Sequence, residues 1–402
     1  MNGLRTGLLC NHTAWDTGSG KYLFELIPDL KRIFVPEHGL FAELQDQEPL
    51  VNTAIYRDFG IDAEIVSLYG NDEKSLRVRT EHLDDLEILI IDLQDIGTRY
   101  FTFAVTMSYL LEAVQMYQPY LNVIVIDREN PAGLQVEGSP LPGEYESFIG
   151  RTGLPHRHGL TIAELALFFH KQLNAGFSLT VVPLRGEKVR RELPGHVTIL
   201  KQKDSPGISH PDSWLIAPSP NIPGPVTPLI YSGQCLLEGT NISEGRGTTR
   251  PFEIFGAPWL KPVTRLKKHR GFMECRGAKL RSLRFVPTFH KWAGQVCGGF
   301  QLHLTGQPYH SLLHSLFIIR TIREYFPEFE WREGPYEKGS DKTAIELICG
   351  DPSLIDYLNG RGGIKEVKEY LIYSEIKWLA EMKSFKLYDR KNYSILQQTF
   401  IL

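Results

Sequence analysis

Short apolar segments alternate with amphipathic segments along the first half of the chain. Apolar runs predict strands at residues 4–10, 31–35, 63–70, 86–92, 122–127 and 177–184, and the segments at 21–30, 102–117 and 161–176 predict helices. Strands that are apolar throughout are buried on both faces, as in parallel sheets covered by helices. The alternation therefore predicts an α/β fold built on a Rossmann-like, doubly wound parallel sheet.

The second half of the chain has a different pattern. Seven prolines between Lys201 and Pro228 exclude a long regular element there. Beyond about residue 260, strands are predicted at 280–289 and 298–304, and amphipathic helices at 311–326 and 363–385. This pattern predicts a smaller C-terminal α+β domain, and we place the boundary so that the domains span residues 1–258 and 259–402.

Length and charge exclude several classes of protein. A chain of 402 residues with a formal net charge of −3 has no basic surface for nucleic acid or for an anionic membrane. No window approaches the roughly 20 apolar residues of a membrane span. The start lacks an export leader, so the chain as given is expected in the cytoplasm; a leader removed upstream would place it in the periplasm or outside the cell. The oligomeric state stays open.

Polar and ionisable residues directly follow the predicted strands. The carboxyl ends of parallel strands meet at one edge of a sheet, where ligands of open α/β sheets bind. We therefore expect a polar cleft at that edge, formed by Asn11, Glu37, His38, Asp92, Gln94, Asp95, Arg99, Tyr100 and Asp127.

Some of these residues also have a purely structural interpretation. Asp127 can cap the helix that follows it, and His38 can be a hydrogen-bonded structural histidine. The structural interpretation is weaker for Glu37, because Pro36 and Gly39 hold it in a tight turn rather than on a solvated face.

A glycine-rich segment, "SEGRGTTRP" at residues 243–251, carries Arg246, Thr248 and Arg250. Guanidinium groups beside glycines and threonines suit the binding of an anion, and a plain surface loop is the alternative. The segment does not match the phosphate-binding loop motifs, and Pro251 disfavours a helix after it.

The remaining side chains narrow the chemistry. The chain has no HExxH or GxSxG motif, its five cysteines include no CxxC pair, and no cofactor is predicted. A metal site formed by Glu37, His38 and the aspartates stays open, although no ligand spacing supports it. Carboxylates with histidines, arginines and aromatic rings suit general acid–base catalysis on a polar, anionic substrate. Glycoside hydrolysis, which uses two carboxylates about 5–10 Å apart, fits this set.

A series of longer motifs occurs in a fixed order along the chain. They read "GLLCNHTAWD", "VPEHGLFAE", "VSLYG", "IDLQDIGTRYFTF", "VIDRENPAG", "VEGSPL", "HGLTIAELA", "PSPNIPGPVTPLIYSGQCLLEGTNISEGRGTTRPFEIFGAPW" and "CGGFQLHLT". In this order and density the motifs resemble the exo-β-N-acetylmuramidases of the NamZ type. The resemblance extends from about residue 3 to the C-terminus.

The resemblance implies a reaction. Members of that family remove terminal N-acetylmuramic acid from the non-reducing end of peptidoglycan-derived glycans, in a cleft between a Rossmann-like catalytic domain and a C-terminal auxiliary domain. Glu37 would protonate the glycosidic oxygen, and His38 would orient it or contact sugar hydroxyls. The second catalytic group stays open among the protein carboxylates and the 2-acetamido group of the substrate. The carboxylate candidates are Asp92, Asp95, Asp127 and Glu244.

The resemblance also implies which residues contact the substrate. The lactyl carboxylate of N-acetylmuramic acid requires a cation, for which Arg246 and Arg250 are the first candidates, before Arg99 and Arg157. The complete expected binding set is Asn11, Tyr69, Asp92, Gln94, Arg99, Tyr100, Arg246, Thr248 and Arg250, with the two tyrosines stacking on the sugar. A non-catalytic binder of cell-wall fragments and a metal-dependent cell-wall hydrolase are the alternatives. The presence of Glu37 and of the "SEGRGTTRP" segment favours an enzyme.

Overall fold

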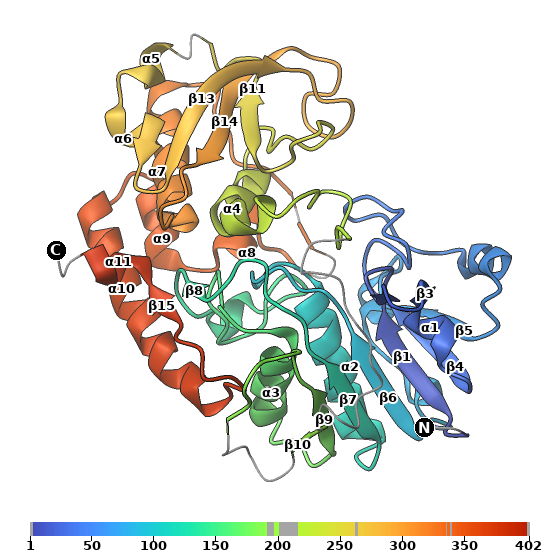
Figure 1. The fold of residues 1–402 in the computed structure, drawn as a ribbon. Coiled ribbons are helices and arrows are strands. Elements are labelled where there is room, and N and C mark those ends of the chain that lie inside the picture. Colours follow the sequence, from blue (N-terminus) through green and yellow to red (C-terminus); the bar gives the residue numbers. More distant parts are fainter. Residues whose placement is uncertain are drawn as a thin grey trace.

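The computed structural model describes residues 3–190, 197–200, 216–261, 264–334, 336–337 and 340–399. Its largest element is a seven-stranded sheet with the order β10-β9-β7-β6-β1-β4-β5, in which every pairing is parallel (Figure 1). The strands are β1 (Thr6–Cys10), β4 (Leu30–Val35), β5 (Glu64–Ser67), β6 (Ile88–Asp92), β7 (Asn122–Ile126), β9 (Leu179–Val182) and β10 (Val197–Ile199). The chain starts at β1, winds outward to β5, returns to β6 and winds outward again to β10. The predicted doubly wound α/β fold is confirmed.

Neighbouring residues of the central strands face opposite sides of the sheet, as the pleat requires. Leu9 and Phe34 join the core on one side, and Leu8 and Ile33 join the core on the other. The first side is covered by α2 (Phe103–Tyr117) and α3 (Ile162–Gln172), which were both predicted. The predicted helix at 21–30 is short, because only Leu23–Leu26 is helical before β4 begins at Leu30.

A smaller antiparallel sheet lies above the carboxyl ends of the parallel strands (Figure 1). Its order is β11-β14-β13-β12, formed by β11 (Ile254–Ala257), β12 (Glu274–Cys275), β13 (Ala278–Phe285) and β14 (Cys297–Leu304). The larger helices of this half of the chain are α4 (Thr227–Gln234), α7 (Ser311–Tyr325), α8 (Ala344–Cys349) and α10 (Ile364–Glu381), and α4 packs against α7. The predicted smaller C-terminal domain is therefore present. Strand β13 ends at Phe285, before Pro287, rather than at residue 289.

The remaining regular elements are short. The strands and α-helices are β2 (Trp15–Asp16), β3 (Lys21–Tyr22), β8 (Gln135–Val136), β15 (Tyr393–Ser394), α5 (Thr264–Lys267), α6 (Arg270–Met273), α9 (Pro352–Leu358) and α11 (Ile395–Thr399). The 3₁₀ helices are η1 (Thr53–Phe59), η2 (Glu73–Leu76), η3 (Thr80–His82), η4 (Gly143–Tyr145), η5 (Cys235–Gly239) and η6 (Met382–Ser384).

The C-terminal part of the chain returns to the first domain. On α10, which runs along one side of the molecule in Figure 1, Trp378 is fully buried and its indole lies 5.7 Å from the Phe168 ring of α3. Strand β15 pairs in parallel with β8. The apolar core therefore continues from one domain into the other. Strand β11 belongs to the second sheet, and the domain boundary at residues 258/259 stays a prediction.

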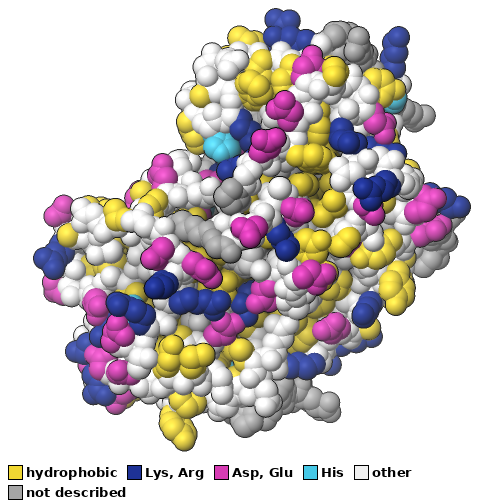
Figure 2. All heavy atoms as spheres, turned by 180° about the vertical axis from the view of Figure 1, so that it is seen from behind, with side chains coloured by type: hydrophobic (Ala, Val, Ile, Leu, Met, Phe, Trp, Pro, Cys, Tyr) yellow, Lys and Arg dark blue, Asp and Glu magenta, His cyan; other side chains and the backbone are white. Residues whose placement is uncertain are grey.

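Two further features of the chain bear on the predictions. Of the proline-rich stretch 201–228, residues 201–215 lie outside the described part, and Thr227 begins α4. No helix in the described part is both long and apolar enough to cross a membrane. Figure 2 shows basic and acidic side chains interspersed over the back face of the molecule, as expected from the small net charge.

Candidate active site

A narrow polar pocket with a free volume of about 40 Å³ lies between the two domains, at the carboxyl ends of β4 and β6. The segments after β4 and β6 contribute Glu37, His38 and Thr102 to its wall, and the segment after α4 contributes Glu238 and Arg246. The sheet order places β1 between β4 and β6, so the pocket lies where the chain reverses its winding direction. Ligands of open α/β sheets bind at this kind of position.

Glu37 is held by hydrogen bonds at the end of β4. The strand ends at Val35, and the Glu37 side chain turns into the pocket, where the residue is 5% exposed. One carboxylate oxygen accepts a hydrogen bond of 2.8 Å from the Thr102 hydroxyl, and the other accepts one of 3.2 Å from the backbone N–H of Gln47. Burial, followed by the charge of Glu37 and a hydrogen bond to it, raises the pKa of Tyr69. Among the described residues, the groups that donate hydrogen bonds to Glu37 are therefore neutral.

His38 follows in a left-handed backbone conformation with φ of 76°, which is unusual for a residue other than glycine. Its Nδ1 lies 3.1 Å from the carbonyl oxygen of Leu44, to which it donates. Its Nε2 therefore accepts from the Ser219 hydroxyl at 3.2 Å in the neutral ring. The ring ties the 38–44 turn to the segment that leads into α4, so it fixes the position of Glu37.

Arg246 lies at the centre of an ion cluster on the opposite side of the pocket. Its guanidinium lies 2.9 Å from a Glu238 oxygen, 3.3 Å from Glu244 and 3.5 Å from Asp46. Lys291 completes the set through a 2.9 Å contact with Glu244. We call these five residues the pocket cluster.

The loop that carries Arg246 depends on a glycine. Gly245 has φ of 85°, and a Cβ at this position would lie 2.5 Å from the carbonyl oxygen of Ile254. The loop can therefore close only with glycine between Glu244 and Arg246. This geometry directs both side chains into the pocket cluster.

The carboxylates of the pocket cluster differ in their electrostatics. Burial opposes the ionisation of Glu244, but the charges of Lys291, His290 and Arg246 prevail and lower its pKa. Asp46 shows the opposite behaviour, because burial raises its pKa to about 6 despite the nearby charge of Arg246. Glu244 is thus fixed as an anion, whereas Asp46 can exchange a proton near neutral pH.

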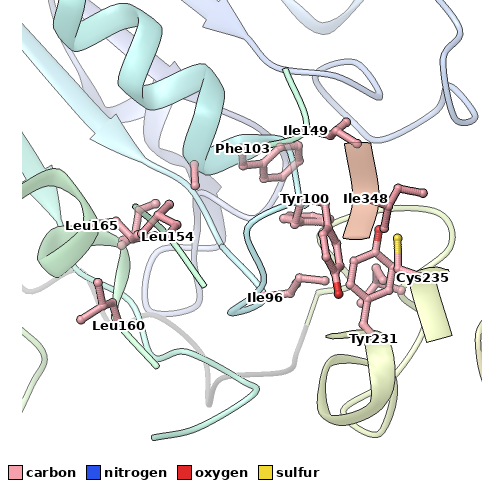
Figure 3. Packing of buried hydrophobic residues seen from close by; sticks show 14 of the residues in the cluster. Ile96, Tyr100, Phe103, Ile149, Leu154, Leu160, Leu165, Tyr231, Cys235 and Ile348 are labelled. Carbon is pink, nitrogen blue, oxygen red and sulfur yellow. The ribbon is translucent and has the colours of Figure 1, made fainter. Parts of the chain in front are cut away.

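Aromatic and apolar side chains form another wall of the pocket. Tyr100 and Tyr231 lie side by side next to Cys235 and Ile348, with the two rings 5.7 Å apart (Figure 3). The hydroxyl of Tyr100 donates to the carbonyl oxygen of Ser232. Burial raises the pKa of the Cys235 thiol well above its ordinary value, so this sulfur is no nucleophile at neutral pH.

Several residues predicted for the cleft do not line this pocket. Asp127 accepts hydrogen bonds from Tyr388, Thr161 and the backbone N–H of Ala163, which tie β7 to the start of α3. Burial raises the pKa of Asp127 to about 7. Its position agrees with the capping interpretation.

Other predicted residues have partners inside the protein. Asp92 pairs with Arg128 at 2.6 Å, and Asp95 lies 3.2 Å from a ring nitrogen of His158. The Gln94 amide donates to the carbonyl oxygens of Asp95 and Glu129, and the Asn11 amide donates to that of Pro218. These four side chains therefore hold the carboxyl ends of the strands in place below the pocket.

The remaining predicted cations lie apart from the pocket. Arg99 is fully buried and donates to backbone carbonyl oxygens, among them those of Ser139 and Cys349, so it joins the two domains. Arg157 pairs with Glu137 at 2.9 Å in the same interior. Arg250 is exposed and pairs with Glu253, and the Thr248 hydroxyl donates to the carbonyl oxygen of Gly245.

The sequence analysis missed several pocket residues, chiefly Asp46, Thr102, Ser219 and Glu238. Asp46 lies in the loop that begins with the Glu37–His38 pair, and its distance of nine residues from Glu37 matches no known motif. Glu238 follows α4 in an apolar segment. The one available signal for Glu238 was its position as an isolated carboxylate in an apolar segment. Because an unpaired buried charge is costly, such a carboxylate is expected to have a partner.

The fold and the pocket together define a class of protein. It is an α/β protein with a Rossmann-like domain, whose carboxylate-rich pocket is closed by a second domain and suits proton transfer to a polar substrate. The comparisons with known proteins identify the family within this class.

The sequence profile described as exo-β-N-acetylmuramidase NamZ, N-terminal, matches residues 6–225, and the corresponding C-terminal profile matches residues 229–388. The chain belongs to this family. It is 35% identical to the peptidoglycan β-N-acetylmuramidase NamZ of Bacillus subtilis over 388 residues, which cover 93% of this chain and 88% of the relative.

Solved structures show the same fold. A DUF1343 family protein from Bacteroides fragilis superposes with a TM-score of 0.74 at 24% identity, covering 96% of this chain and 94% of its own. A second DUF1343 family protein from the same organism gives a TM-score of 0.68 at 22% identity, with coverages of 97% and 95%.

Proposed function

We propose that this protein is an exo-acting glycoside hydrolase that releases terminal N-acetylmuramic acid from the non-reducing end of peptidoglycan fragments, with Glu37 as the general acid. Membership of the NamZ family and the identity to the Bacillus subtilis enzyme support the reaction. The observation that supports the role of Glu37 is its set of partners. Among the described residues, no arginine or lysine forms an ion pair with it, so no cation holds it as an anion.

Glu37 differs in this respect from the other carboxylates considered for catalysis. Glu244 is bound by Arg246 and Lys291, and Asp92 is bound by Arg128. A carboxyl group must carry a proton before it can donate one to the glycosidic oxygen, and a nearby cation favours its loss. Of these three carboxylates, Glu37 alone has no arginine or lysine bonded to it among the described residues, which suits the role of a proton donor.

For the second catalytic group, we propose the 2-acetamido group of the substrate. Of the four carboxylates considered for this role, none lines the pocket. The acetamido oxygen would attack C1 while Glu37 gives its proton to the leaving oxygen, so that a cyclic intermediate forms as the glycosidic bond breaks. The resulting Glu37 carboxylate would then take a proton from the water molecule that opens this intermediate, which restores the acid.

Arg246 is the proposed partner of the lactyl carboxylate. It is the one arginine or lysine that lines the pocket among the described residues. Its planar guanidinium suits a carboxylate geometrically. The rings of Tyr100 and Tyr231 on the neighbouring wall provide apolar surface for a sugar ring.

The deciding experiment compares two substrates, the disaccharide of N-acetylmuramic acid with N-acetylglucosamine and para-nitrophenyl N-acetyl-β-muramide. Loss of a general acid typically costs about 10²–10⁴ in rate. We therefore expect Glu37→Gln to lose at least about a hundredfold in kcat on the disaccharide. The loss should be smaller on the nitrophenyl glycoside, because nitrophenolate leaves without being protonated.

Two controls accompany this comparison. Glu48→Gln removes the same charge from an exposed position of the same loop and should retain the activity of the parent protein. The para-nitrophenyl N-acetyl-β-glucosaminide, which lacks the lactyl group, should be a poor substrate in the presence and absence of EDTA. Equal activity of Glu37→Gln and the parent protein on the disaccharide would remove Glu37 from its role.

A further inference from the structure

Asp46 is the least firmly held carboxylate of the pocket cluster. Its side chain is 21% exposed, and its ion pair with Arg246 spans 3.5 Å. Glu238, by comparison, accepts a 2.9 Å hydrogen bond from Arg246 and another from the Tyr336 hydroxyl, and Glu244 is 0% exposed. Asp46 is therefore the member that a ligand can displace at the lowest cost.

The charges around Arg246 leave no room for another anion. Three carboxylates already surround this guanidinium, and Lys291 and His290, whose charges lower the pKa of Glu244, both contact Glu244. Glu37 contributes a further carboxyl group to the same small pocket. A substrate carboxylate can therefore bind Arg246 favourably only if one existing negative charge moves away or is neutralised.

We propose that Asp46 occupies the place on Arg246 that the lactyl carboxylate of the substrate takes, and that Asp46 leaves this place as a neutral acid after taking up one proton from solvent. This inference rests on the proposed function. The proton adds to the Asp46 carboxylate, the Arg246–Asp46 ion pair breaks and the Arg246–lactyl ion pair forms, so the net charge of the pocket is unchanged. Asp46 is thus a specificity-determining residue for anionic sugars.

The surroundings of Asp46 support the exchange. Burial is the main cause that raises its pKa to about 6, with Glu238 and Glu37 acting in the same direction and Arg246 and His38 against it. The other titratable groups that face it are Tyr69, Cys235 and Tyr336, which burial keeps neutral by raising their pKa values. Protonation of Asp46 near neutral pH is therefore inexpensive, and removal of Arg246 as its partner would raise its pKa further.

The exchange makes binding depend on pH in a predictable direction. Below about pH 6 Asp46 already carries the proton, so binding needs none. Above that pH the proton must be taken from solvent, and the affinity for N-acetylmuramic acid should fall by up to about tenfold per pH unit. N-acetylglucosamine, which has no carboxylate, should show no such dependence.

The test is calorimetric titration of the full-length protein with N-acetylmuramic acid at pH 7.5, in two buffers that differ in ionisation enthalpy. We expect the uptake of nearly one proton per sugar bound. In Asp46→Asn the uptake should vanish, and the affinity at pH 7.5 should rise by up to about thirtyfold, which is the cost of protonating a group with a pKa of about 6. Glu48→Gln is the matched control and should behave as the parent protein does.

The outcomes separate this inference from the proposed function. Hydrolysis of the disaccharide without proton uptake on binding, or uptake that persists in both Asp46→Asn and Asp46→Ala, would overturn the role of Asp46 and leave the enzyme intact. Absence of both hydrolysis and binding, in protein with an unchanged far-ultraviolet spectrum, would overturn the proposed function itself. Asp46→Ala also serves as the second variant if Asp46→Asn does not fold.

Discussion

Two buried ion clusters lie between the domains of this protein. They differ in how many hydrogen bonds their carboxylate oxygens accept from the protein. The first is the pocket cluster around Arg246. The second, which we call the core cluster, consists of Glu137, Arg157, His310 and Glu375, all of which are buried.

The core cluster is saturated by protein donors. One oxygen of Glu137 accepts from Arg157 and from the Gln135 amide, and the other accepts from the Ser232 hydroxyl and the backbone N–H of Leu312. Glu375 accepts from the backbone N–H of Gly138, from His310 and from the Ser394 hydroxyl. In the pocket cluster, by contrast, Asp46 forms one ion pair of 3.5 Å within the described part of the chain. A buried cluster whose carboxylate oxygens all accept hydrogen bonds from the protein has a structural role. A cluster that contains one weakly held carboxylate can instead bind a ligand.

The largest effect on stability is expected from the core cluster. Replacement of Arg157 by Met should lower the free energy of unfolding by about 3–5 kcal/mol, because Glu137 would be left as a buried charge without its arginine. Urea denaturation followed by tryptophan fluorescence measures the change. Arg185→Met, at an exposed arginine, is the control and should stay within about 0.5 kcal/mol of the parent protein. If Arg157→Met lost as little stability as the control, the complete hydrogen bonding of the core cluster would contribute little to the stability of the protein.

A smaller loss of stability is expected at Glu244, the fully buried carboxylate of the pocket cluster. Glu244→Gln should lower the free energy of unfolding by about 2–3 kcal/mol at neutral pH, because Lys291 and Arg246 lose a charged partner in the interior. The exposed Glu330→Gln provides the control.

The pH dependence of this effect follows from the lowered pKa of Glu244. A carboxyl group whose pKa is lower in the folded than in the unfolded state contributes stability above the unfolded pKa, and loses it as the pH falls through the folded pKa. The difference between Glu244→Gln and the parent protein should therefore be constant from about pH 5 to 8 and shrink only at lower pH. A difference that already disappears at pH 6 would contradict the assigned ionisation.

The fold was predictable from sequence because its signals are local and repeated. Runs such as the apolar residues 86–92 specify buried parallel strands, and the helices at 102–117 and 161–176 have lengths and periodicities that few other structures allow. Glu37 was predictable for a related reason, because its position after a strand and beside Pro36 and Gly39 fixes it at the sheet edge. The shortness of the helix before β4 was not predictable, because its end is set by tertiary packing.

Which arginine lines the pocket could not be predicted in the same way. Arg246 and Arg250 lie four residues apart in one glycine-rich segment, and nothing in that segment says which side chain is buried. The difference arises largely from Asp46, which reaches Arg246 from the loop after β4, and from Glu238 in η5, which add to Glu244 of the segment itself. Such distant contacts leave no trace in the local pattern.

The smallest effect is therefore expected at Arg250, whose side chain is 55% exposed and pairs with Glu253. Exposed ion pairs of this kind contribute about 0–1 kcal/mol, so Arg250→Ala should change the stability little. Because Arg250 does not line the pocket, the KM for para-nitrophenyl N-acetyl-β-muramide should change less than about threefold. Steady-state rates on the muramide and on the matching glucosaminide measure the effect. A loss confined to the muramide would instead assign Arg250 to the lactyl carboxylate, and would mean that an exposed arginine can close over the pocket when substrate binds.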